Sequence, residues 1–452
     1  MDNSDHHLHY GTASQPGLLP AAKHKTAENG RITWQDWPVM RRNHLIDLAR
    51  VLSMAIVVTF HGLLYYITLD NGRPEVIPYA PGPWLWYLSW AFCLIPVFFV
   101  ASGYGAAAVV ERNATLGISY AEYLHSRLRK MLGPLTSFLT VFVLASTVPA
   151  WAGYFEPAVE LSKRFAQLLW FLVVYLCLQA AAPLLVRLQE RYAVLVTLGL
   201  VIATMAVDTI ARASGYWDLH WLNLATVWPL AFQFGIAYRH GWFVSLSRRT
   251  LALMVLALGA VISWMVTGLG YPASAVGFAD MLVANVQPPT LAAVWMVSAQ
   301  VCLLAILDKS RVFRDPDERT RHTLGTLNAL VLSVYLWHIV AIVLAGALLA
   351  GVTMLCPVLA PVTLSSIALV IGTWAALIAI IGPIARIDAR LVPPAPLRMP
   401  TLVPTLIGFL LLVAGLWSVW QFGAVLHPGA PLAGVAVALL AVGMTVIRRI
   451  GR

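Results

Sequence analysis

The sequence predicts an all-α, polytopic integral membrane protein with about 12 transmembrane helices. Of its 452 residues, 60% are hydrophobic and only 11% are charged. Apolar runs of about 20 residues, the length that crosses a bilayer as a helix, recur along the chain. Alternation of apolar and polar residues with a period of two is absent, which favours helices over a β-barrel. The predicted spans lie near residues 45–69, 84–110, 131–152, 165–187, 192–212, 220–239, 251–269, 290–308, 324–350, 361–385, 401–422 and 430–447.

The basic residues predict that both termini face the cytoplasm. With the N-terminus inside, Arg50 lies within the membrane, and the Lys and Arg residues on the outer side are only Arg73, Lys163, Arg164 and Arg212. The positive-inside rule therefore fits an even number of spans in the cytoplasmic membrane. This topology also accounts for the net charge of +10, so no nucleic-acid partner is expected.

Composition changes near both ends of the chain divide it into three parts. Residues 1–43 are polar and lack the apolar core of a cleavable signal sequence, which predicts a disordered cytoplasmic tail. A proline-rich segment at 393–404 separates ten spans, within 44–392, from a linker and two additional helices in 393–452. The cysteines show no zinc or disulfide spacing, and the tail histidines have no acidic or thiol partners, so no metal is expected.

The first span carries two polar side chains that need an explanation, Arg50 and His61. They are eleven positions apart, which returns a helix to within about 20° of the same face after a rise of about 16 Å. A charged residue at membrane depth costs about 2.5 to 3.5 kcal/mol, so a functional role is the default expectation. Asp47 is placed to pair with Arg50. The structural alternatives are an arginine that reaches the headgroups and a histidine bonded to a neighbouring helix.

Several segments, in order, resemble the membrane acyltransferase-3 superfamily. The run from His44 to His61 matches an arginine, ten residues and a histidine in that family's first span. Residues 96–104, Pro-Val-Phe-Phe-Val-Ala-Ser-Gly-Tyr, are similar to its Phe-Phe-x-x-Ser-Gly-aromatic signature. Residues 123–130 look like the basic loop before its third span, except that Lys130 stands where the family tends to have a second arginine. Residues 169–176 and 333–338 resemble later segments, so that the resemblance covers residues 44 to about 392.

The resemblance implies transfer of an acyl group, often acetyl, from cytoplasmic acyl-CoA to a hydroxyl of a carbohydrate, glycolipid, antibiotic or envelope polymer. In this interpretation Arg50 orients the donor, and His61 either deprotonates the acceptor hydroxyl or is itself acylated. It requires the Arg50 guanidinium and the His61 imidazole to share one cavity that a thioester can enter from the cytoplasm. The expected donor contacts are Arg127, Arg129, Lys130, Ser102 and Gly103. A second group of candidate site residues consists of His338, Tyr335, Trp170 and Asp47. We expect any second transfer step to need a separate envelope-modifying protein.

Simpler interpretations remain open for most of these residues. Basic loops set membrane topology, small residues such as Ser102 and Gly103 allow helices to pack closely, and His338 suits a satisfied packing role. For the whole chain, twelve spans also fit a transporter or flippase of an envelope precursor, although the two halves are not visibly alike. A lipid-linked glycosyltransferase would need outward acids, either Asp70 with Glu75 or Glu156 with Glu160. Consumption of acyl-CoA distinguishes the acyltransferase from both.

Overall fold

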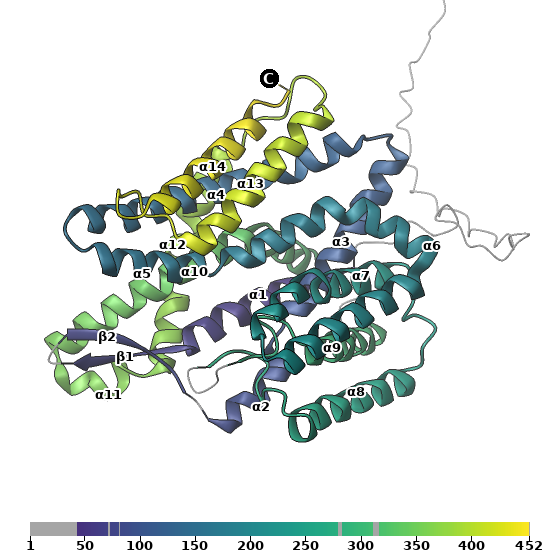
Figure 1. Cartoon of the computed structure of the whole chain (residues 1–452), viewed down its shortest axis with the longest axis horizontal. Coiled ribbons are helices and arrows are strands. Elements are labelled where there is room, and N and C mark those ends of the chain that lie inside the picture. The colour runs from purple at the N-terminus through teal and green to yellow at the C-terminus, as the bar shows by residue number, and fades with distance from the viewer. Residues whose placement is uncertain (1–42, 71–72, 81, 279–282, 311–315, 452) are drawn as a thin grey trace, which may run out of the picture. The chain divides into compact units, whose positions relative to one another are not determined.

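A computed structural model describes residues 43–70, 73–80, 82–278, 283–310 and 316–451. The predicted N-terminal tail therefore lies almost wholly outside the described residues. The described chain is almost entirely helical, which confirms the predicted fold class (Figure 1). Its helices are α1 (His44–Leu63), α2 (Pro83–Phe92), α3 (Ile95–Thr115), α4 (Tyr120–Trp151), α5 (Phe155–Ala166), α6 (Leu169–Ser214), α7 (Val227–Arg239), α8 (Arg248–Gly268), α9 (Leu291–Lys309), α10 (Glu318–Leu355), α11 (Ala360–Thr363), α12 (Ser366–Leu391), α13 (Leu402–Phe422) and α14 (Pro431–Arg449). Two short 3-10 helices, η2 (Trp217–Ala225) and η3 (Pro357–Leu359), and one hairpin of β1 (Tyr65–Asp70) with β2 (Arg73–Pro78) complete it.

Ten stretches of the described chain are long and apolar enough to cross a membrane. The longest, Phe155–Ser214, contains two of the predicted spans. A straight α6 of 46 residues would be about 69 Å long, yet residues just before and just after it, Leu168 and Trp221, line one cavity. The backbone leaves helical geometry at Tyr192, so α6 reverses there and forms two spans. The predicted span 220–239 is a 3-10 segment followed by α7, which has only 13 residues; the total of twelve stays a prediction.

The first span is shorter than the sequence pattern predicts. Helix α1 ends at Leu63 rather than near residue 69, and the chain continues into an antiparallel hairpin with Tyr65 opposite Pro78. The aromatic and β-branched residues at 65–68 favour an extended strand. Ile67 of this hairpin is buried against Ile342 and Leu369, which belong to α10 and α12. The hairpin therefore covers the end of α1 that carries His61.

The second predicted span is broken. Helices α2 and α3 are separated at Cys93 and Leu94, just before Pro96 in the first turn of α3. Backbone groups freed inside a membrane protein need internal partners, and Gln300 supplies one by donating its side-chain N–H to the Cys93 carbonyl at 2.9 Å. The break places Pro96 in the first turn of α3, where a proline has no hydrogen bond to lose.

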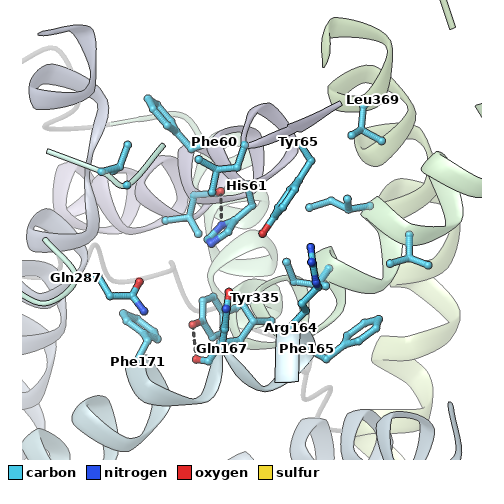
Figure 2. Close-up of a pocket in the computed structure, with 18 of the residues that line it drawn as sticks. Phe60, His61, Tyr65, Arg164, Phe165, Gln167, Phe171, Gln287, Tyr335 and Leu369 are labelled. Carbon is cyan, nitrogen blue, oxygen red and sulfur yellow. Dashed lines mark hydrogen bonds between the residues drawn. The ribbon is translucent and has the colours of Figure 1, made fainter. Parts of the chain in front are cut away.

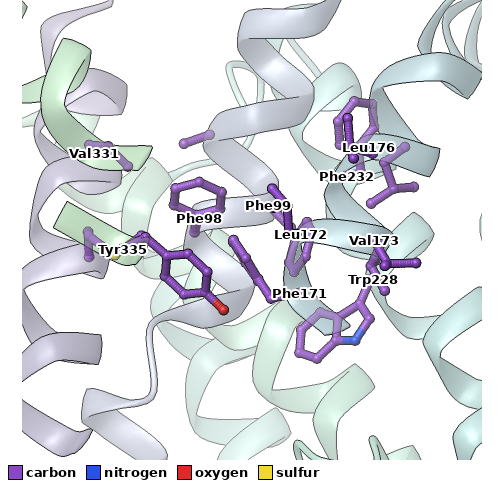
Figure 3. Packing of buried hydrophobic residues seen from close by; sticks show 14 of the residues in the cluster. Phe98, Phe99, Phe171, Leu172, Val173, Leu176, Trp228, Phe232, Val331 and Tyr335 are labelled. Atoms are coloured by element: carbon purple, nitrogen blue, oxygen red, sulfur yellow. The ribbon is translucent and has the colours of Figure 1, made fainter. Parts of the chain in front are cut away.

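Aromatic side chains from α3, α6 and α7 form the centre of the core (Figure 3). The rings of Phe99 and Trp228 stack with centroids 5.0 Å apart, and Phe98 meets Phe171 at 5.1 Å. Helices α3 and α7 approach closely because Gly103 and Gly235 have no side chain; a Cβ on either would overlap a backbone carbonyl of the opposite helix.

The loop between α8 and α9 is anchored by one buried carboxylate, Asp208 of α6. It accepts hydrogen bonds from His220 Nε2 and from the Leu291 backbone N–H, both at 3.1 Å, and from the Tyr271 hydroxyl. Burial, and then the hydrogen bond to Asp208, raise the pKa of Tyr271, so this phenol stays a donor at neutral pH. The anchor holds the loop whose residue Gln287 lines the cavity that contains His61.

The last two helices pack on the rest of the membrane domain. Helices α13 and α14 form a close pair in which Gly415 faces the backbone of Leu440 and Gly443 faces that of Leu412. Small residues at such crossings allow the helices to approach each other. Helix α13 also contacts α4, α5 and α6 (Figure 1, yellow), which brings one of its tryptophans to the functional site described below.

Candidate functional site

A cavity of about 1550 Å³ lies at the His61 end of α1 (Figure 2). This volume exceeds the 300 to 1,000 Å³ or so of typical small-molecule sites. Its wall is mainly apolar and comes from α1, the hairpin, the α2–α3 break, α5, the start of α6, the α8–α9 loop, α10, α12 and α13. The polar residues on the wall are Ser53, His61, Tyr65, Glu75, Glu160, Arg164, Gln167, Gln287 and Tyr335.

His61 lines this cavity from the last turn of α1, and Figure 2 shows its ring directed into the open space. Its Nδ1 lies 2.8 Å from the Val57 carbonyl oxygen one turn earlier. A carbonyl can only accept a hydrogen bond, so Nδ1 carries the proton and Nε2 presents a lone pair. The helix itself therefore fixes both the ring and the tautomer, which leaves Nε2 as a base or nucleophile.

A second imidazole, His338 of α10, lies directly beside His61. The two ring centroids are 4.8 Å apart, and His338 is fully buried. Its Nδ1 donates to the Tyr335 carbonyl at 2.5 Å, while its Nε2 has no hydrogen-bond partner within the described part of the chain. Two neighbouring imidazoles that each keep an unprotonated nitrogen can share a single added proton.

Two other residues of the predicted second group, Tyr335 and Trp170, line the cavity, whereas His338 does not. The Tyr335 hydroxyl donates to the Leu168 carbonyl at 2.6 Å, which ties α10 to the chain just before α6. Its ring packs on Phe171 with centroids 4.8 Å apart. The structure thus gathers His61, His338, Tyr335 and Trp170 in one place, although they come from three helices.

Arg50 does not share this cavity, contrary to our expectation from the sequence. Its guanidinium lies over the Phe98 ring, with the carbon 5.4 Å from the centroid, and its Nε lacks a hydrogen-bond partner among the described residues. Phe98 and Ser53 line the cavity, whereas Arg50 does not. The sequence predicts only the shared face of α1; the Arg50 guanidinium packs on Phe98 of α3, and that ring, rather than Arg50, lines the cavity.

The other donor contacts predicted from the basic loop lie near the first turns of α4. Arg127 stands over Tyr123 at 5.6 Å, and its buried Nε is unpaired in the described structure. Arg129 donates instead to the Pro393 carbonyl at 2.7 Å, which holds the linker after α12, and Lys130 is exposed. A guanidinium with a buried, unpaired N–H is suited to an anionic group.

Asp47 is separate from the second group in which the sequence analysis placed it. It lies near the beginning of α1, where its carboxylate is 4.0 Å from the His44 imidazole. It does not line the cavity that contains His61. Pairing of Asp47 with Arg50 stays a prediction.

Ser102 and Gly103 lie at the α3–α7 crossing rather than on the cavity wall. The Ser102 hydroxyl donates to the Phe98 carbonyl in its own helix at 2.7 Å, and Gly103 faces the backbone of Phe232. Both residues are buried. The helix-packing alternative therefore accounts for them, and their expected donor contact is not supported.

Several cavity residues escaped the sequence analysis because their proximity is tertiary. Tyr65 follows the unexpected end of α1, and Trp420 lies on α13 with its ring 5.5 Å from that of Trp221. Arg164 on α5 lies 3.1 Å from Glu160, one of the acids considered for glycosyl transfer. The charged and apolar faces of residues 155–166 indicate an amphipathic surface helix. They do not indicate that this helix lines the same cavity as His61.

A family model described as an acyltransferase domain, acyltransferase family 3, matches residues 43–382. The matched range includes Arg50, His61 and His338, whereas Trp420 lies beyond it. Comparison with curated proteins and with solved structures gave no match.

Proposed function

We propose that this chain, which belongs to the acyltransferase-3 family, transfers an acetyl group from cytoplasmic acetyl-CoA to a hydroxyl of a carbohydrate, glycolipid or other cell-envelope acceptor. The protein is a multi-pass membrane acyltransferase. The observation that supports the further detail is the Nε2 lone pair of His61 at the wall of a large cavity. The cytoplasmic membrane, with the His61 end outward, is the location that the basic residues favour.

In the direct mechanism, His61 acts as a general base. Its Nε2 accepts the proton of the acceptor hydroxyl while the hydroxyl oxygen attacks the thioester carbonyl carbon. The new C–O bond forms as the C–S bond breaks, and the proton passes from the imidazole to the coenzyme A thiolate. His338, 4.8 Å away between ring centroids, is placed to share that proton during the step.

In the relay mechanism, His61 Nε2 attacks the thioester itself. A C–N bond forms and the C–S bond breaks, which gives an acyl-histidine and the coenzyme A thiolate. The acceptor oxygen then attacks the same carbonyl carbon, and the C–N bond breaks as the ester forms. The acceptor proton passes to His61 Nε2 as the C–N bond breaks and from there to the coenzyme A thiolate, which restores the neutral imidazole.

Arg50 and Arg127 are the groups that best suit the polar part of the donor. Each has a guanidinium nitrogen that is buried without a hydrogen-bond partner in the described chain. Charge-assisted bonds from arginine to phosphate are strong and directional. Phe98 separates Arg50 from the cavity, so the thioester must pass this ring to reach His61.

The decisive experiment is to incubate the purified protein with radiolabelled acetyl-CoA in the absence of acceptor. Label on the peptide that contains His61 supports the relay. Absence of label, together with release of coenzyme A when envelope lipids and glycans are added, supports direct transfer. The His61→Ala variant should lose both label and turnover, whereas His322→Ala, at an exposed position of α10, should keep both. Unchanged turnover in His61→Ala would refute the catalytic assignment.

The acceptor can be identified by comparing envelope glycans and lipids from cells with and without the protein. We expect one class of molecule to lose the mass of one acetyl group. An unaltered envelope in cells that demonstrably contain active protein would contradict the proposed acceptor class.

A further inference from the structure

One wall of the cavity is an apolar strip on α10. Val343, Ala347, Ala350, Gly351 and Met354 all line the cavity, and their spacing of three, four or one puts them on one face of the helix. From the first to the last, this strip extends for about 16 Å. We call these five residues the α10 trough.

The α10 trough matches one leaflet of a bilayer in length. The hydrocarbon core is about 30 Å thick, so that one leaflet contributes about 15 Å. The small side chains in the middle of the trough leave room for a ligand: a Cβ added to Gly351 would have no atom within 4 Å. The space beside α10 is therefore long enough and apolar enough to hold an aliphatic chain.

The two end residues of the trough are partly exposed, and so are their neighbours Leu344 and Leu355, which do not line the cavity and are 49% and 90% exposed. The side chains of Val343 and Met354 line the cavity and yet are 43% and 56% exposed. In a membrane-spanning helix, exposed apolar side chains of this kind face hydrocarbon. A molecule dissolved in the bilayer can thus approach the trough from the side.

Polar groups also line the same cavity. Tyr65, Gln167 and Gln287 line it together with His61, as Figure 2 shows, and Arg164 with Glu160 adds a charged pair at 3.1 Å. Hydroxyl, amide and charged groups beside an apolar trough are the arrangement that recognises an amphiphile, because they bind its head while the trough binds its chain.

We propose that the α10 trough binds the aliphatic chain of an amphiphilic substrate whose polar head lies at His61. The role of the head rests on the proposed function, but occupancy of the trough by a chain does not. The chain is that of a lipid-bearing acceptor, because the acetyl group of the proposed donor is too short to fill the trough; a long acyl chain on the donor is the alternative source that the second arm of the test examines. Both sources share the same chemistry.

The test is photo-crosslinking of the purified full-length protein in nanodiscs. One arm uses dodecyl glucoside with a diazirine at the end of its chain, and the other uses palmitoyl-CoA with the diazirine at the same place. Adducts are mapped by mass spectrometry. We expect label on the α10 peptide 343–354 in at least one arm, with competition by unmodified dodecyl glucoside or palmitoyl-CoA but not by glucose or acetyl-CoA. The arm that labels identifies the source of the chain.

A matched pair of variants makes the result specific. Gly351→Phe fills the trough and should reduce labelling of residues 343–354 at least fivefold. Gly199→Phe introduces the same ring at an exposed position of α6 where a Cβ also meets no atom within 4 Å, and it should leave labelling unchanged. Equal labelling of all lipid-facing helices in both arms, or undiminished labelling in Gly351→Phe, would overturn the proposal.

The same experiment separates this inference from the proposed function. His61→Ala should retain the α10 adduct while it loses acyl transfer. If the unmodified protein gives the α10 adduct but has no transferase activity, the catalytic proposal alone is refuted, whereas turnover of the unmodified protein without an α10 adduct would refute the trough alone.

Discussion

The imidazole rings of His61 and His338 lie 4.8 Å apart between centroids, although one belongs to α1 and the other to α10. Each ring donates its Nδ1 proton to a carbonyl of its own helix, Val57 for His61 and Tyr335 for His338. Each ring thereby keeps an unprotonated Nε2; His61 lines the cavity, and the His338 Nε2 is buried without a hydrogen-bond partner in the described part of the chain. We therefore treat the two histidines as one unit for proton transfer.

This pairing predicts non-additive losses of activity. His61→Ala should lower turnover by about 10²- to 10⁴-fold, the usual contribution of a positioned acid or base, and His338→Ala should fall at the lower end of that range. The double variant should be no slower than His61→Ala alone, because groups that act as a unit do not contribute additively. The measurement is coenzyme A release in proteoliposomes that contain envelope lipids and glycans. A double variant slower by the product of both single effects would show that the histidines act independently.

Arg50 should act on donor binding rather than on the chemical step. Loss of one charge-assisted hydrogen bond costs about 1.5 to 3 kcal/mol, so Arg50→Ala should raise KM for acetyl-CoA about 10- to 100-fold with kcat changed much less. Arg50→Lys should recover only part of this loss, because an ammonium lacks the flat fork of the guanidinium. Arg449→Ala, at an exposed position of α14, is the control. A large fall in kcat at unchanged KM would place Arg50 in the reaction itself.

Gly103 should matter for stability and not for the donor. A Cβ there would overlap the Phe232 carbonyl, so Gly103→Ala should destabilise the protein by about 1 to 3 kcal/mol through overpacking. Gly105→Ala, two residues along the same helix, meets no atom within 4 Å and should be neutral. Thermal unfolding in detergent measures both. A normal melting temperature with a raised KM for acetyl-CoA in Gly103→Ala would restore the donor-contact interpretation.

Trp420 should influence which substrates the cavity accepts. It is the α13 residue on the wall, and it packs against Trp221 at 5.5 Å. Trp420→Ala enlarges the cavity, so the ratio of kcat/KM values for two donors or acceptors of different size should shift toward the larger. Leu410→Ala, at an exposed position of the same helix, should leave that ratio unchanged. Equal ratios in both variants would limit α13 to a scaffold role.

Much of the site depends on contacts that no local pattern contains. The eleven-residue spacing of Arg50 and His61 predicts a common face of α1, but it does not contain the Phe98 ring that lies between Arg50 and the cavity. The segment at 333–338 suggested Tyr335 and His338 as candidates, yet only the packing of α10 on α1 decides that His338 meets His61. For Ser102 and Gly103 the opposite holds. Their sequence signature suggested a contact with the donor, whereas the close crossing of α3 and α7 accounts for them.

By itself, the sequence determined that the chain is an all-helical membrane protein, where most of its apolar segments lie, and that Arg50 and His61 occupy one side of the first helix. These are consequences of composition and of helical periodicity, which act over a few turns of chain. The tertiary structure decided that α1 ends at Leu63, that α2 and α3 part at Cys93, and that α13 brings Trp420 to the cavity. Those features arise from packing between segments far apart along the chain, where side-chain volume and the pairing of buried polar groups select one arrangement among many that the local pattern allows.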